Sequence, residues 1–215
     1  MSFLNQLKSQ AAALQHQQAG VQRSFEESTA QTEYACQTVW VYLQELMRQL
    51  NVIAPAGPQL SVDGKTPWPA MQLKDFRFDA RKKHLRGKEV FDYLTLGWDI
   101  VPQQGKPVAA SVKVNFPPDL ERVQKRLGLG AIPHDRQDVR DPEKNALRAY
   151  RFEFLTQSRG SVVVTPDHDQ ASLAFRLTNL SGFELVTSTW TAQRVGSSLM
   201  DELAKRIVQQ PSLFI

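Results

Sequence analysis

The hydrophobic pattern of the chain changes its period once, near residue 54. Before that point apolar residues recur at alternating spacings of three and four, which is typical of an α-helix. After residue 69 apolar and polar residues alternate, which is typical of half-buried strands. A proline-rich stretch separates the two patterns. We therefore expect a helical region at 1–53, a linker at 54–69 and an α+β domain at 70–215.

The first helical stretch carries the repeat of a coiled-coil seam. Seven positions follow this repeat: Leu4, Leu7, Ala11, Leu14, Gln18, Val21 and Phe25. Six of them are apolar, and a polar residue at one seam position, here Gln18, usually fixes register or oligomeric state. Three heptads are near the lower limit for a coiled coil. The stretch therefore either packs back on its own domain or binds a second copy or a helical partner.

A second helical stretch runs from about Thr32 to Leu50 and has a broader apolar face. Its width predicts packing on a sheet rather than a narrow seam. Gly20 weakens the helix before it by about 1 kcal/mol relative to alanine, so we expect a bend or break there. The whole region is then either an arm or a helical hairpin. Cys36 has no basic neighbour in the sequence, which indicates a buried side chain and not a nucleophile.

The alternating segments predict a mostly antiparallel sheet of about seven strands, in a chain of α+β class. A helix at 197–209 should pack on one face of this sheet, which has room to curve strongly. The charged segment 133–142 has proline at both ends and is predicted to be a surface loop. From residue 148 onward the short connections predict four strands that pair in sequence order.

Positive charge is concentrated in one part of the chain. The formal net charge is +4, and residues 70–90 alone hold seven Lys and Arg against three Asp and Glu. Six basic side chains lie between two strand patterns: Arg81, Lys82, Lys83, His84, Arg86 and Lys88. A basic hairpin tip of this kind either binds an anionic partner, such as nucleic acid or an acidic surface, or protects a sheet edge from pairing.

The sequence carries none of the common catalytic or cofactor-binding signatures that we sought: GxSxG, GxxxxGK[ST], GxGxxG after a strand, or CxxC. The His/Asp groups at 134–135 and 167–169 lack a known metal-ligand spacing. We therefore predict no catalytic residue, no metal and no cofactor. An enzyme whose site is assembled from scattered residues stays open.

Three further features bear on where the protein works. A single cysteine fits a reducing compartment. No apolar run approaches the roughly 20 residues that span a bilayer, and the N-terminus lacks the pattern of a signal peptide. We interpret the chain as a cytoplasmic, bacterial, non-enzymatic interaction protein that forms a homodimer or binds a helical protein through residues 4–25.

Two other hypotheses concern different surfaces. The basic hairpin at 81–88 would bind an anionic polymer. Alternatively, a small apolar ligand would occupy a pocket between the curved sheet and the C-terminal helix. The aromatic residues available for such a pocket would equally serve an ordinary core: Trp98, Phe152, Phe154, Phe175 and Trp190.

Overall fold

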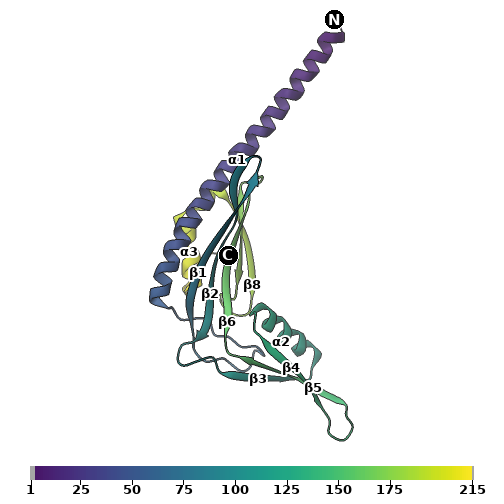
Figure 1. Cartoon of the computed structure of the whole chain (residues 1–215), viewed down its shortest axis with the longest axis vertical. Helices are drawn as coiled ribbons and strands as arrows, with labels where there is room; N and C mark the ends of the chain where they lie inside the picture. The colour runs from purple at the N-terminus through teal and green to yellow at the C-terminus, as the bar shows by residue number, and fades with distance from the viewer. Residues whose placement is uncertain (1–2, 215) are drawn as a thin grey trace.

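The structure is a computed structural model that describes residues 3–214; in the first helix, the side chains of residues 3–6, 9, 13, 16, 18 and 19 are outside the description. Helix α1 (Phe3–Ile53) is continuous over 51 residues, which makes it about 76 Å long at about 1.5 Å per residue. Its first half projects beyond the body of the molecule (Figure 1).

This continuous helix corrects two expectations. The helical-hairpin alternative is wrong, and α1 runs through Gly20 without interruption. A single glycine costs only about 1 kcal/mol relative to alanine, which is too little to interrupt a helix whose following half packs on a sheet. No helix within residues 3–214 is long and apolar enough to cross a membrane.

Within residues 3–214, eight strands form two antiparallel sheets, which confirms the predicted α+β class. The larger sheet has the order β1-β2-β6-β7-β8, and the smaller sheet has the order β3-β5-β4. The larger sheet contains β1 (Met71–Leu85), β2 (Lys88–Pro102), β6 (Ser158–Asp167), β7 (Ser172–Thr178) and β8 (Leu185–Thr191). The smaller sheet contains β3 (Ala109–Val114), β4 (His134–Arg140) and β5 (Leu147–Leu155).

The smaller sheet differs from what the pattern predicted. The expected loop at 133–142 contains β4, an edge strand in which every residue except Val139 is exposed. A strand with both faces in solvent has no alternation of apolar residues to reveal it. β5 and β6 were expected to pair, but they belong to different sheets. Thr156, between them, is tied instead to Val108: its N–H donates to the Val108 carbonyl, and its hydroxyl accepts the Val108 N–H.

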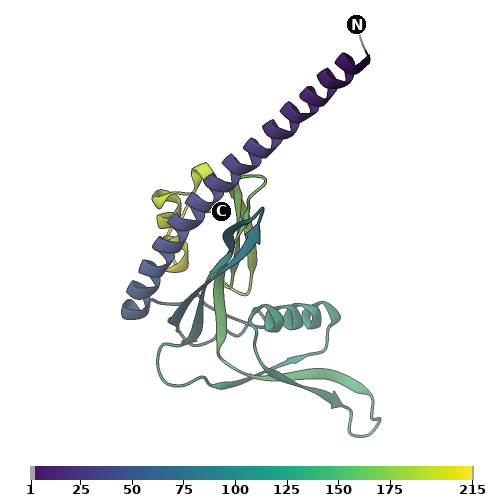
Figure 2. The ribbon, with the colours of Figure 1, turned by 45° about the horizontal axis from the view of Figure 1, so that its top comes forward.

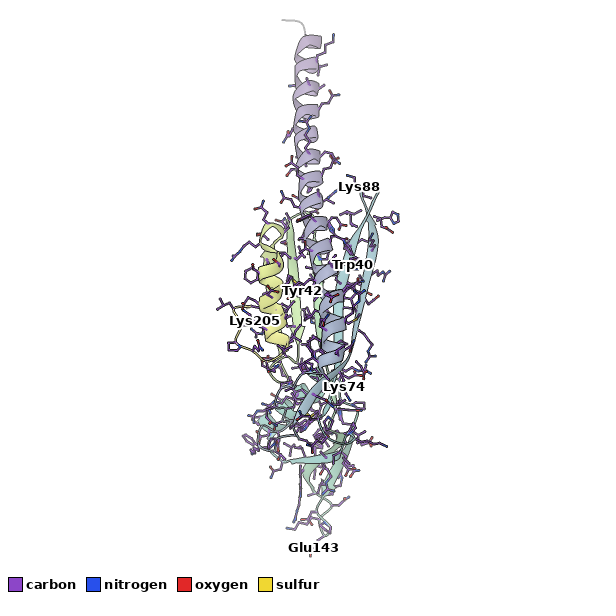
Figure 3. The ribbon with its side chains drawn as sticks, turned by 90° about the vertical axis from the view of Figure 1, so that its left-hand side faces the viewer. Trp40, Tyr42, Lys74, Lys88, Glu143 and Lys205 are labelled. Atoms are coloured by element: carbon purple, nitrogen blue, oxygen red, sulfur yellow. The ribbon has the colours of Figure 1, made fainter. Side chains whose placement is uncertain are left out.

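The main core lies between one face of the larger sheet and the helices α1 and α3 (Ser197–Ile207), as Figure 2 shows. From α1, the fully buried side chains Ala35, Val39 and Leu43 enter this core. The Tyr42 hydroxyl donates to Asp201 of α3 at 2.6 Å (Figure 3). The predicted packing of the second helical stretch and of the C-terminal helix is therefore confirmed. Helix α2 (Pro117–Leu129) lies beside the smaller sheet (Figure 1).

Residues 54–69 are packed into the body and do not form an open spacer. Leu60, Val62 and Trp68 are buried. The Pro55 carbonyl accepts the Leu73 N–H at 2.8 Å, and Ala56 forms an isolated bridge to Gln72. The segment therefore covers one end of the outer edge of β1.

Candidate functional site

The apolar seam of the first helical stretch and the buried face of the second lie on one continuous line along α1. Residues 18 apart share the same angular position on a helix of 3.6 residues per turn. Leu14 is therefore in line with Thr32 and Leu50, and Val21 is in line with Val39. We call this line the stripe, and we call residues 3–25 the arm.

Burial along the stripe changes abruptly where the sheet ends. Thr32, Val39 and Leu50 are at most 3% exposed against the sheet. In the arm, Leu7, Leu14 and Val21 are 45%, 58% and 51% exposed, and Ala11 is exposed as well. The side chains of the predicted seam residues Leu4 and Gln18 lie outside the description. The seam side chains that the structure describes between residues 7 and 21 therefore present an apolar surface to solvent.

The tip of the β1–β2 hairpin meets α1 where the arm begins. The Arg86 guanidinium stacks 4.2 Å from the centre of the Phe25 ring and forms an ion pair with Asp169. It also lies 3.4 Å from the Thr29 hydroxyl. Phe25, which the sequence assigned to the seam, is thus half-buried against the protein's own hairpin. This contact marks the end of the body and limits the open part of the stripe to residues before 25.

A buried polar contact fixes α1 just below this point. The Glu33 carboxylate lies 2.9 Å from Nε2 of His168 and also accepts the Phe91 N–H at 2.9 Å. The His168 side chain is 2% exposed. The Thr32 hydroxyl donates to the Ser28 carbonyl at 2.8 Å. The two contacts of Glu33 attach α1, eight residues after the end of the arm, to β2 and to the turn after β6.

Half of the basic residues predicted to bind an anion are paired with carboxylates of the same domain. Lys82 pairs with Glu89 and Lys83 pairs with Asp92, at 3.4 and 3.1 Å. Arg86 is held by Asp169, as described above. The remaining candidates are Arg81, His84 and Lys88, which are exposed near the hairpin tip (Figure 3 labels Lys88). Binding of an anionic partner stays a prediction, with less free positive charge than the sequence suggested.

The two His/Asp groups are not brought together. His134 lies in β4 with its Nδ1 2.9 Å from the Ile132 carbonyl oxygen, whereas His168 faces Glu33 in the larger sheet. Among the residues that the structure describes, no group of three or more His, Cys, Asp or Glu side chains is placed to hold a metal ion. Glu33, which no sequence pattern singled out, is the acidic partner of the buried histidine.

The aromatic residues considered for an apolar pocket belong to the packed core. Trp98, Phe152 and Phe175 are at most 2% exposed. The ring of Phe214 fills the space beside Phe175 and Trp190, with centroid distances of 5.4 and 5.9 Å. A groove of about 390 Å³ lies instead on the opposite, polar face of the larger sheet, with Arg77, Asp99 and Arg159 among its lining residues. Of these aromatic residues, Phe154 lines a separate cavity of about 180 Å³ together with Trp68 and residues 108–112. An apolar ligand remains a prediction.

Cys36 is fully buried on the stripe. Burial, with a smaller contribution from the nearby Glu33 carboxylate, raises the pKa of its thiol to about 12. A thiol in this state is a structural side chain and not a nucleophile.

The chain matches no protein-family model, no curated protein and no solved structure. The arguments about function therefore start from the arm and the surfaces of the body.

Proposed function

We propose that this protein is a self-associating interaction protein whose arms pair as antiparallel helices. The observation that supports the proposal is the change in burial along the stripe. The sheet covers the stripe from Thr32 to Leu50, whereas Leu7, Leu14 and Val21 are exposed. A helix that leaves its apolar face in water gains nothing from tertiary packing there, and most helical stability in proteins comes from such packing. A second helix would supply the missing contact.

The continuity of the stripe supports an antiparallel direction of pairing. In a parallel pair, the partner's helix would follow the stripe past residue 25 and enter the space that the protein's own sheet occupies. In an antiparallel pair that overlaps between residues 4 and 21 of each copy, these residues stay clear of the other copy's sheet, and the two bodies lie at opposite ends. Only the second arrangement lets the stripe be covered along the whole of α1.

The position of the hairpin tip supports one register for this pair. Antiparallel coiled coils pair the first apolar position of one heptad with the fourth of the other. Arg86 lies beside Phe25 and Thr29, so a partner helix has to end before it reaches this level. Among the registers that satisfy both conditions, the one that covers most of the seam places Leu4 opposite Val21, Leu7 opposite Gln18 and Ala11 opposite Leu14, each across the two copies.

The residues that flank the seam favour a second copy as the partner. They are Phe3, Gln10, Gln17 and Ser24 on one side and Lys8, Gln15 and Gln22 on the other. Charged flanking residues usually choose a coiled-coil partner by attraction or repulsion. Here Lys8 is the single charge, and in this register it does not face itself. Self-pairing therefore meets no like-charge repulsion, and an oppositely charged helix would gain little.

Light scattering or sedimentation on the full chain tests self-association. We expect the full chain to associate through its arms. Leu7→Glu/Leu14→Glu should lose this contact, because carboxylates would enter the seam. The matched control is Ser9→Glu/His16→Glu, which adds the same charges at the same spacing on the opposite side of the helix. Equal masses for the two double variants at all concentrations would contradict the proposal.

Disulfide trapping tests the direction. In the antiparallel register, position 7 lies beside position 18 of the partner, whereas positions 7 of the two copies are about 16 Å apart at about 1.5 Å per residue. Leu7→Cys/Gln18→Cys should therefore form a covalent dimer under oxidation, and Leu7→Cys alone should not. The native Cys36 is fully buried and gives no background. A covalent dimer of the single variant would indicate parallel helices.

A further inference from the structure

The outer edge of β8 is the least protected sheet edge in the described part of the chain. An edge strand presents unpaired N–H and C=O groups, and proteins usually guard such edges with charges, bulges, proline or a covering segment. β8 has the sequence LVTSTWT, without charge or proline, and pairs with β7 alone. Its seven consecutive pairs with β7 run from Ser172–Thr191 to Thr178–Leu185 without a bulge.

The other edges carry the usual protection. β1 has a register shift between Lys74 and Arg77, a dense run of charged residues and the segment 54–57 along one end. Five of the seven residues of β4 are charged or histidine. β3 contains Lys113, and residues 66–69 line a cavity together with residues 108–112. Because the other edges are protected, the unprotected edge of β8 is the best candidate for pairing with a strand of another molecule.

The hydrogen bonds around β8 show which backbone groups face outward. The Ala192 N–H donates to the Ala171 carbonyl at 2.7 Å, and the Asn179 N–H donates to the Glu184 carbonyl at 2.9 Å. Hydrogen-bonded pairs alternate along an antiparallel ladder, so the even-numbered residues of β8 face β7. The outward backbone groups therefore belong to Leu185, Thr187, Thr189 and Thr191, whose side chains are exposed.

We propose that β8 pairs with β8 of a second copy, in antiparallel orientation about Ser188, and joins two larger sheets into one. In this register Leu185 faces Thr191 and Thr187 faces Thr189 across the two copies, so all four outward residues pair their N–H and C=O groups. Threonine pairs across strands are favourable. The even-numbered positions place Val186 beside Trp190 of the other copy.

Charge supports a second copy in this orientation. The residue before β8 is Glu184, and the nearest charged residue after it is Arg194. Antiparallel pairing brings the acidic end of one strand to the basic end of the other, whereas parallel pairing would place like charges together. Leu185, one of the four outward residues, is 43% exposed and would lose exposed apolar surface in this contact.

This inference does not depend on the arm, and the test separates the two contacts. The mass of the full chain is measured in the Leu7→Glu/Leu14→Glu background, where arm pairing is lost. We expect a dimer in this background, held by β8. Adding Thr187→Pro/Thr189→Pro should give a monomer, because proline removes outward N–H groups only and is tolerated on the free side of an edge strand.

The matched control is Thr187→Val/Thr189→Val, which keeps both N–H groups and the β-propensity and should remain a dimer. If the proline variant fails to fold by circular dichroism, Thr187→Lys/Thr189→Lys replaces it, since lysines would then face one another across the two strands. A monomer in the arm-variant background at every concentration would overturn the proposal. A dimer that neither the proline nor the lysine variant weakens would also overturn it. So would a mixed sample in which β8 binds a strand of another protein and not β8 of a second copy.

Discussion

The two halves of α1 have the same hydrophobic period, but the apolar face is buried in one half and exposed in the other. From Thr32 to Leu50 the stripe is buried against the larger sheet, and from Leu7 to Val21 it is exposed. The difference does not lie in the helix, which is continuous and in phase over both halves. It lies in the length of the sheet, whose β1–β2 hairpin ends beside Phe25. A periodic pattern of apolar residues thus predicts that one face of a helix will be covered. It does not predict whether the same chain or another molecule covers that face.

The largest expected effect is on the free energy of unfolding, to which the two halves of α1 should contribute very differently. Leu43→Ala removes a fully buried side chain and should lower the free energy of unfolding by about 2–5 kcal/mol. Leu14→Ala, at a 58% exposed position, should change that of the monomer by less than about 0.5 kcal/mol. Urea unfolding followed by circular dichroism, at concentrations where the chain is monomeric, measures both. Similar losses for the two variants would show that the arm packs on its own body.

The reactivity of a cysteine thiol should also differ strongly between the two halves of α1. With its pKa raised to about 12 by burial, Cys36 should react with a thiol reagent at pH 8 about 10³-fold more slowly than an unshifted thiol, because the thiolate is the reactive form. In Leu14→Cys, a thiol-counting assay should detect one fast thiol before denaturation and two after it. Two fast thiols in the folded variant would contradict the burial of Cys36.

The same group has a consequence for stability at high pH. An unfolded chain ionises this thiol near pH 9, whereas the folded chain does so only near pH 12. The contribution of the buried thiol to stability is therefore complete below pH 9 and is lost as the pH rises from 9 to 12. Cys36→Ala should remove this part of the pH dependence of unfolding.

A smaller effect is expected where the two halves meet. Glu33→Ala leaves Nε2 of His168 and the Phe91 N–H without their partner. An unsatisfied buried polar group costs about 1–3 kcal/mol, so urea unfolding should detect a loss in this range. Hydrogen exchange should also accelerate around residues 28–33. Glu27→Ala, at an exposed position nearly two turns earlier, is the control, and an equal loss there would argue against the contact.

The smallest effect concerns the affinity of the arms. Gln18→Leu replaces the one polar seam residue and should tighten the dimer roughly tenfold, which corresponds to about 1.4 kcal/mol. Sedimentation at several concentrations measures the dissociation constant. The control is Gln17→Leu, beside the seam, which should have less effect. A weaker dimer for Gln18→Leu would mean that position 18 does not lie in the seam.

Residue patterns predicted much of this fold. Helical spacing located α1 and α3, and alternation located the strands that have one face in the core. β4 was missed because both its faces are exposed, and the division into two sheets was missed because short connections suggested continuous pairing. The contacts of Arg86 with Phe25 and Asp169 and of His168 with Glu33 join residues far apart in the chain. No local pattern reports such contacts, which depend on how the elements are packed.

For the candidate sites, the sequence predicted an apolar seam but not which part of it the sheet leaves exposed. The angular match of Leu14 with Thr32 and Leu50 could be calculated from the sequence alone. Its meaning depends on where the sheet stops, which only the structure shows. The bare edge of β8 could likewise be identified only after the strand order was known, since LVTSTWT in a central strand would need no protection.

The continuity of α1 makes it a molecular ruler. In the proposed antiparallel register, the two bodies begin about 46 Å apart along the helix axis, from residue 28 of one copy to residue 28 of the other, at about 1.5 Å per residue. Inserting one heptad into the arm would lengthen this spacing by about 10 Å and keep the stripe in phase. Because each body also carries a bare sheet edge, the helix would set the repeat distance of any larger assembly.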